Sequence, residues 1–472
     1  MQLRIRSLLS LGRALALASC AILSAPAGEP PAHAAPLSRP LATRTGDPRS
    51  WASFEDCLED LRRWGPDLPD WVVHSVPLRY QARKPAFDAG GRPVLGPGGQ
   101  PVTTAVTLTG RVFFPPAWRA GPGASLPLVL YSHATELKKD AVPSSFGGKE
   151  WLLGAAAAAW FGFAVAMPDL PGMGGDAAAF HPFCHAQSLA YATVDSLPAV
   201  RRMFSEDPYL LAHQYRWDGQ LFLVGYSEGG YTTLAAVREL ETRAADHAFS
   251  VTGSACMAGP FDLSGAMRAT FIDPGLGYPR SYYLPYFVLG YHQVYGPRLD
   301  PLAVFAPALL APGPDGNILS WADGSQDGLA VDERMGKRLG QPPDAINLRR
   351  MFNPAWLARE LDDPAYASSR VRGLLVENDL CRGWAPTRPM LFRHSPDDVN
   401  IPYANTLTTL EGLGREIHRA GGNPAKVLFL WPIGQPGDGI SHSAGALTAI
   451  PSAFAWFYYG MPALDALVQL GW

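Results

Sequence analysis

One stretch of the sequence constrains the fold more than any other, because it joins a buried strand to a helix through a glycine-rich turn. The apolar segment 221–225 (LFLVG) is typical of a buried strand, and residues 231–245 have the pattern of a helix. Between them stands GYSEGG at 225–230. Small residues let a strand and a helix pass closely around a serine, whose hydroxyl then projects above the sheet from a strained turn. We therefore expect Ser227 to be a nucleophile.

The rest of the chain supplies a sheet on which such a turn can stand. Uninterrupted apolar strands that alternate with helices are typical of a parallel sheet covered on both faces. Two further alternating segments, 74–80 and 102–114, flank glycine-rich turns and indicate an antiparallel entry to the sheet. Strands are expected at 126–131, 163–167, 221–225, 251–257, 390–392 and 426–431, and helices at 54–64, 151–160, 188–204, 231–245, 405–420 and from His442 onward.

The alternation of strands and helices stops near Pro260 and resumes near residue 388. The intervening segment is rich in proline, glycine and tyrosine. We therefore predict a core whose first part is 35–262 and whose second part is 388–472, with a cap inserted at 263–387. Tyrosines crowd between 278 and 295, where they either pack inside the cap or line an apolar pocket above the nucleophile.

Residues 1–34 have the features of an export signal. A basic start is followed by a short apolar stretch at 14–23 and by small-residue cleavage patterns at 25–27 and 32–34. The sequence therefore predicts a secreted or periplasmic protein. The alternative is a lipoprotein anchored through Cys20, because LASC at 17–20 resembles a lipid-attachment motif.

A serine needs an acid and a base, and in this kind of fold the chain order is nucleophile, acid, base. The acid should follow a strand end, as Asp398 does after the strand at 390–392. Asp397 is the rival, with turn capping as its other role, and Asp379 is an outside candidate because it precedes the strand.

Two histidines follow Asp398, and they stand in different settings. His418 falls within the helix expected at 405–420. His442 follows the last strand and the glycine-rich loop 434–439, and a loop suits a base that must reach over the serine. We therefore expect His442 to be the base, held in one tautomer by the acid.

An oxyanion hole needs backbone N–H groups that are in place before the reaction starts. Glu228, directly after the nucleophile, should supply one of them. The second should come from the loop after the strand at 126–131, with Thr135 as first choice and Ala134 as second. His133 is expected to tie this loop down.

Four cysteines remain after removal of the signal. Cys57, Cys184, Cys256 and Cys381 could form two disulfides, in three pairings, or stay as buried thiols.

Two groups of residues imitate metal sites. His181, Cys184 and His185 crowd together, but a fourth ligand and a second cluster are not apparent. A calcium-like loop starts at Asp323 and has Arg334 where the loop requires a glutamate. We expect no metal and no cofactor.

With these residues in hand, the chain resembles the secretory lipase family of α/β-hydrolases. The shared segments are YSHAT at 131–135 with Pro143-Ser144, PDLPGMG at 168–174, His181-Pro182, GYSEGG at 225–230 and HSPDDVNIP at 394–402. The resemblance implies cleavage of lipid-like carboxylic esters, with nucleophile, acid and base on Ser227, Asp398 and His442. The family often has glycine where Ala134 stands, and it usually has glycine at position 136 or 137.

The sequence thus predicts a secreted serine carboxylesterase or lipase that acts on a small-molecule ester or lipid, with peripheral contact with lipid surfaces as an option. A net charge of −3 without basic clusters argues against a nucleic-acid partner. The alternatives are a serine peptidase on the same fold, or a non-catalytic binding protein on a hydrolase scaffold.

Overall fold

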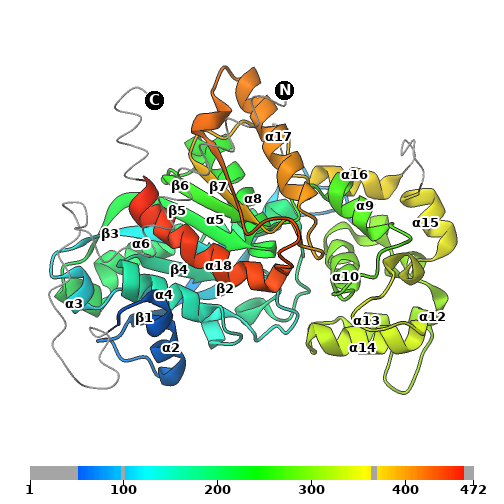
Figure 1. Ribbon diagram of the computed structural model, residues 1–472, viewed down its shortest axis with the longest axis horizontal. Helices are drawn as coiled ribbons and strands as arrows, with labels where there is room; N and C mark the ends of the chain where they lie inside the picture. The colour runs from blue at the N-terminus through cyan, green and yellow to red at the C-terminus, as the bar shows by residue number, and fades with distance from the viewer. Residues whose placement is uncertain (1–50, 97–100, 363–368, 462–472) are drawn as a thin grey trace.

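The computed structural model describes residues 51–96, 101–362 and 369–461 (Figure 1). The signal expected at 1–34 and the lipidation alternative at Cys20 lie outside the described residues. Among the residues described, no helix is long and apolar enough to cross a membrane. The apolar run 152–167 instead forms helix α4 (Trp151–Phe161), a turn at Gly162 and strand β4 (Ala164–Pro168).

A single eight-stranded sheet forms the centre of the molecule, in the order β1-β2-β4-β3-β5-β6-β7-β8. β1 pairs antiparallel with β2, and β2 pairs antiparallel with β4, whereas the remaining neighbours are parallel. The expected fold class, a mostly parallel sheet with an antiparallel entry, is confirmed. The other strands are β1 His74–Pro85, β2 Thr103–Phe114, β3 Ser125–Ser132, β5 Arg216–Tyr226, β6 Gly253–Met257, β7 Met390–His394 and β8 Leu428–Pro432.

Helices cover both faces of this sheet, because alternate side chains of its strands enter two separate cores (Figure 1). In β3, Leu128 and Leu130 belong to one core, and Val129 and Tyr131 belong to the other. The second core is covered by α4, by α2 (Phe54–Trp64) and by α18 (His442–Ala455). The helices of the first core are α5 Ala186–Val194, α6 Leu197–Glu206, α8 Glu228–Thr242 and α17 Ala404–Arg419.

The single helix expected at 188–204 is wrong, since two helices, α5 and α6, occupy this stretch. The chain turns between them at Asp195 and Ser196. Pro198 lacks a backbone N–H and fits the first turn of a helix, so a new helix starts there. Asp195 uses its carboxylate to bind Arg83 on β1, at 2.8 Å from Nη2. The turn between α5 and α6 is therefore linked to β1, the edge strand of the sheet.

The segment between β6 and β7 forms a helical subdomain at one side of the sheet, where a cap was expected at 263–387 (Figure 1). Its helix α14 is only partly buried, whereas most side chains of α10 are buried. Its helices are α9 Arg268–Phe271, α10 Tyr283–Tyr295, α11 Pro301–Val304, α12 Pro307–Leu310, α13 Ile318–Trp321, α14 Gly328–Leu339, α15 Pro354–Glu360 and α16 Arg370–Glu377. Two shorter helices of the core are α3 Ala117–Ala120 and α7 Pro208–Ala212.

The four cysteines of the described region are all buried free thiols: Cys57, Cys184, Cys256 and Cys381. Of the two alternatives for them, the structure therefore has buried thiols. Cysteine side chains that pack as small apolar groups are common in cores.

Candidate active site

Ser227 stands between β5 and α8 in a strained backbone conformation, with φ 60° and ψ −126°. The close packing at this turn requires glycine on both sides. A Cβ added to Gly225 would lie 2.1 Å from the carbonyl oxygen of Gly229, and one added to Gly229 would lie 2.1 Å from that of Ser132. The motif thus has its glycines where strand and helix touch, and the turn presents the Ser227 hydroxyl at the carboxyl end of β5.

The structure brings Ser227, His442 and Asp398 into one hydrogen-bonded chain, although they come from three separate segments. His442 is the first residue of α18, and its Nε2 lies 2.8 Å from Ser227 Oγ. Its Nδ1 lies 2.5 Å from Asp398 Oδ2. An ionised carboxylate only accepts hydrogen bonds, so Nδ1 carries the proton and the lone pair of Nε2 faces the serine. This is the tautomer that a general base needs.

The Asp398 carboxylate is saturated with hydrogen-bond donors. The backbone N–H groups of Asn400 and Ile401 donate to Oδ1, both at 2.9 Å, and His394 Nε2 shares Oδ2 with His442 at 3.1 Å. Burial raises the pKa of Asp398, but the hydrogen bonds and charges of His394 and His442 outweigh burial and hold this pKa well below its ordinary value. Asp398 therefore stays ionised across the neutral range.

His394 is a site residue that the sequence analysis missed. Its Nε2 also lies 2.9 Å from the carbonyl oxygen of Ile401, and its Nδ1 lies 2.8 Å from Thr406 Oγ1. The imidazole thereby joins Asp398, the turn that follows it and helix α17. The signal available was a histidine four residues before the acid, at the end of a buried strand.

The rivals for acid and base lie elsewhere. Asp397 accepts the N–H groups of Gly437 and Gly439, and so fastens the loop that precedes His442. Asp379 binds Ser264 and Arg382. His418 is exposed on α17.

Three residues were predicted for the oxyanion hole. Glu228 and Thr135 are still candidates, whereas the prediction for Ala134 is wrong. Glu228 starts α8, and its N–H has no acceptor within the described residues; Thr135 lines the same pocket as Ser227 and Glu228. The N–H of Ala134, the second choice for the loop, donates to Glu150 Oε2 at 2.8 Å and is not available to an oxyanion. The tie-down expected of His133 stays local, since its Nδ1 lies 2.8 Å from the carbonyl oxygen of Ala134.

Glu150 holds the loop that carries Thr135, and the sequence offered no pattern that singled it out. Its Oε1 accepts the Tyr131 hydroxyl at 2.6 Å, while Oε2 accepts Ala134 N–H. Burial raises the pKa of Glu150, against the opposing influence of His133 and these hydrogen bonds. The loop is therefore held by a buried carboxyl group at the start of α4.

Glu136 follows Thr135 on this loop and gives a pH prediction. Burial, with the charge of Glu150, raises the pKa of Glu136 to about 7. A carboxyl whose pKa is raised on folding stabilises the protein below its ordinary pKa, and this stability is lost as pH rises through about 7. Glu136→Gln is therefore expected to raise the Tm more at about pH 8 than at about pH 5.

Thermal unfolding of both proteins at the two pH values measures this difference. Glu411→Gln is the matched control, because Glu411 is an exposed carboxylate on α17. Equal gains for Glu136→Gln at both pH values would contradict the prediction.

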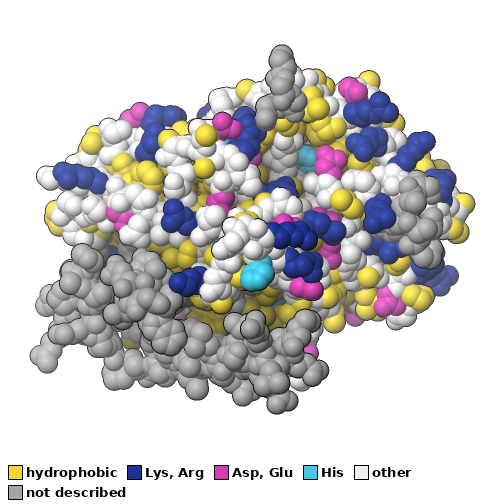
Figure 2. Space-filling model, turned by 90° about the horizontal axis from the view of Figure 1, so that it is seen from above, with side chains coloured by type: hydrophobic (Ala, Val, Ile, Leu, Met, Phe, Trp, Pro, Cys, Tyr) yellow, Lys and Arg dark blue, Asp and Glu magenta, His cyan; other side chains and the backbone are white. Residues whose placement is uncertain are grey.

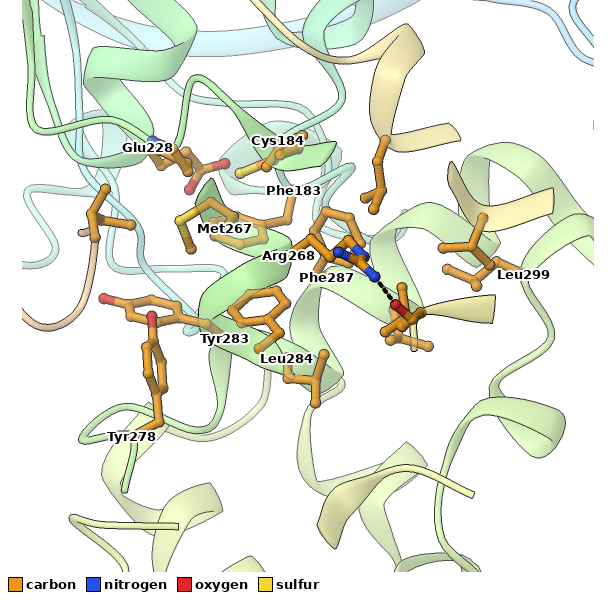
Figure 3. Close-up of a pocket in the computed structure, with 18 of the residues that line it drawn as sticks. Phe183, Cys184, Glu228, Met267, Arg268, Tyr278, Tyr283, Leu284, Phe287 and Leu299 are labelled. Atoms are coloured by element: carbon orange, nitrogen blue, oxygen red, sulfur yellow. Dashed lines mark hydrogen bonds between the residues drawn. The ribbon is translucent and has the colours of Figure 1, made fainter. Parts of the chain in front are cut away.

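A largely apolar pocket of about 780 Å³, including open solvent at its mouth, extends from Ser227 into the helical subdomain. Figure 3 shows Glu228 and Cys184 at one end of this pocket and Leu299 at the other. Tyr278 and Tyr283 contribute to its wall, so some of the tyrosines between 278 and 295 line the pocket. Others pack in the core: the hydroxyl of Tyr286 donates to the carbonyl of Glu136 and that of Tyr291 to the carbonyl of Cys184.

The residues that imitate metal ligands have other partners. His181 lies against Glu228 and the carbonyl of Pro171, and His185 Nδ1 lies 2.8 Å from Ser188 Oγ. In the described part of the chain, ligand atoms of Asp262, Asp379 and Cys381 lie close together. The Arg382 guanidinium binds both of these carboxylates, which accounts for that cluster.

No protein-family model matches the chain, and no curated protein gives a significant match. Solved structures do match. The rice cell wall degrading esterase LipA from Xanthomonas oryzae is 22% identical with a TM-score of 0.58, over 81% of this chain and 89% of LipA.

The chain has the α/β-hydrolase fold. A Legionella pneumophila protein described as a hydrolase is similar at 20% identity and a TM-score of 0.61, over 87% of this chain and 95% of that protein. The closed state of Candida antarctica lipase A is 15% identical with a TM-score of 0.53, over 84% of this chain and 83% of the lipase. At these identities the similarity establishes the α/β-hydrolase fold alone.

Proposed function

We propose that this protein is a serine carboxylic-ester hydrolase that acts on esters with an apolar acyl group. The observation that carries the proposal is the hydrogen-bonded chain from Ser227 through His442 to Asp398, with Ser227 in the lining of an apolar pocket. A serine with a base and an orienting acid is the arrangement of nucleophilic acyl transfer. The similarity to an esterase and a lipase supports the same reaction class.

The positions of these atoms support the following reaction. His442 Nε2 takes the proton of Ser227 Oγ as the oxygen attacks the ester carbonyl carbon. The N–H groups of Glu228 and Thr135 hold the resulting oxyanion. His442 then protonates the leaving alcohol, and the ester bond breaks to leave an acyl group on Ser227. Water, deprotonated by His442, attacks this acyl-enzyme and releases the carboxylic acid.

The test is hydrolysis of p-nitrophenyl esters from acetate to palmitate, with Ser227→Ala as control and a fluorophosphonate probe to label the nucleophile. The proposal expects hydrolysis that depends on Ser227, and labelling of Ser227. Cleavage of p-nitroanilides in preference to esters would replace it with a peptidase. Absence of labelling in folded protein would leave a non-catalytic binding protein.

The pocket gives a prediction on chain length. Each CH₂ that the pocket buries should raise kcat/KM by about fourfold, from about 0.8 kcal/mol, until the pocket is full. Leu299 is 2% exposed and lies at the end of the pocket opposite Glu228 (Figure 3). Leu299→Phe is therefore expected to move the optimum to shorter esters while the rate on acetate changes little.

The kcat/KM profile across the ester series measures this shift. Leu302→Phe is the matched control, because Leu302 is 62% exposed on α11 and should leave the profile unchanged. An optimum that stays the same in folded Leu299→Phe would show that the acyl chain does not reach Leu299.

We also propose that the protein is exported, on the pattern of residues 1–34. Sequencing the N-terminus of the mature protein tests this, since export predicts a new N-terminus after residue 27 or 34, and a lipoprotein predicts lipidated Cys20.

The proposed partner is an ester or a lipid. On the described part of the face shown in Figure 2, basic side chains gather at the centre and right, with some acidic and apolar side chains among them.

A further inference from the structure

A buried ion pair stands directly beside the nucleophile, and the proposed reaction does not use it. The side chain of Glu228 turns away from solvent to His181, whose Nε2 lies 2.6 Å from Glu228 Oε1. Both side chains are 1% exposed. Among the described residues, this is the one ion pair that Glu228 makes. The residue that offers an N–H to the oxyanion therefore also carries an acidic group inside the site.

The proton count of this pair follows from its hydrogen bonds. His181 Nδ1 lies 2.7 Å from the carbonyl oxygen of Pro171, which only accepts, so Nδ1 carries a proton. The 2.6 Å contact between Nε2 and Oε1 needs a second proton, because two lone pairs at this distance would repel. Whether that proton stands on nitrogen or on oxygen, the pair as a whole has no net charge.

This neutrality matters because a negative oxyanion forms within the same pocket. Ser227, Glu228 and Thr135 line the apolar pocket together, and Figure 3 shows the Glu228 side chain beside it. Charges interact strongly in a site of low dielectric, so an uncompensated carboxylate would oppose the oxyanion. We infer that His181 is a positioning residue that keeps the Glu228 side chain electrically neutral as a pair, so that the oxyanion can form beside it. The inference rests on the proposed hydrolysis through Ser227.

The groups around the pair can be distinguished from it. Cys184, Tyr283 and Tyr286 face Glu228, and burial together with its charge raises the pKa of each, so they stay neutral near pH 7. The ring of Tyr286 stacks on His181 at 5.6 Å between centroids. Three other titratable groups lie close by. One is Glu136, whose backbone carbonyl accepts a hydrogen bond from the Tyr286 hydroxyl, and the others are Asp398 and His442, which are linked to Ser227. All of them are common to the variants compared below.

The experiment removes His181 in two backgrounds. His181→Phe keeps a ring against Tyr286 but deprives Glu228 of its partner. An unpaired buried carboxyl is neutral at low pH and ionises as pH rises. The variant should therefore lose kcat/KM progressively as pH rises from about 6 to about 9, by about tenfold or more at the upper end. In the Glu228→Gln background, His181→Phe should lower kcat/KM by less than about threefold, and this reduction should not grow as pH rises.

The ratio of kcat/KM between His181→Phe and its parent, followed against pH in each background, measures the effect. His181→Gln is the second variant if His181→Phe does not fold, since its side chain has no charge but still donates. A ratio that is equal in both backgrounds and flat with pH would overturn the inference and leave His181 a packing residue. If the wild-type protein showed no Ser227-dependent hydrolysis, the proposed function would be overturned, and this inference with it.

Discussion

Replacing Ser227 by alanine is expected to lower kcat for ester hydrolysis by about 10⁶-fold. His442→Ala should lower kcat by as much, because Ser227 Oγ and His442 Nε2 share one proton across 2.8 Å and neither group is effective alone. The double variant should therefore be no slower than either single variant. Residual hydrolysis above the rate in water would come from the N–H groups of Glu228 and Thr135.

Single-turnover kinetics with a p-nitrophenyl ester measure these losses, and thermal unfolding shows whether each variant folds. Losses that multiply in the double variant would mean that Ser227 and His442 act in separate steps. Activity that survives Ser227→Ala would place the nucleophile on another residue.

Replacing Asp398 by asparagine is expected to lower kcat by about 10⁴-fold. The asparagine amide would donate to His442 Nδ1, and the imidazole would then carry its proton on Nε2, where it cannot accept the proton of Ser227. Loss of the carboxylate would also leave the donors at Asn400, Ile401 and His394 with a weaker acceptor. The pKa of Asp398 is lowered in the folded protein, so its carboxylate stabilises the fold above the ordinary aspartate pKa, and that stability is lost as pH falls through the lowered value.

Asp397→Asn is the matched control, since it changes the neighbouring residue in the same way. Asp397 holds the loop before His442 through Gly437 and Gly439, so we expect a loss of about tenfold or less, from a less ordered base. Pre-steady-state rates of the two variants compare them directly. If Asp397→Asn proved the slower of the two, the acid would have to be reassigned to Asp397.

The path of the chain through the sheet could be predicted from local patterns. Buried parallel strands are uninterrupted apolar segments, so β3, β4, β5 and β7 stand out in the sequence. The glycines at 225 and 229 mark the turn because strand and helix touch there. Chain order then suggested where an acid and a base should follow Ser227. Where the local pattern was continuous but the chain turned, as at Asp195 and Ser196 between α5 and α6, the prediction of one helix was wrong.

The arrangement of the loop that carries Thr135, and the charges around Ser227, depend on the tertiary structure. Ala134 N–H is taken by Glu150, 16 residues away, and His181 meets Glu228 across 47 residues. Neither partner has a sequence signature, because hydrogen bonds between distant segments depend on which loops the sheet brings to the same edge. Strand and helix patterns, by contrast, arise from burial that each segment carries in its own residues. Local sequence therefore determined the framework and the order of the reacting groups, whereas the partners that set their protons and charges followed from the packing of distant loops at the carboxyl ends of the strands.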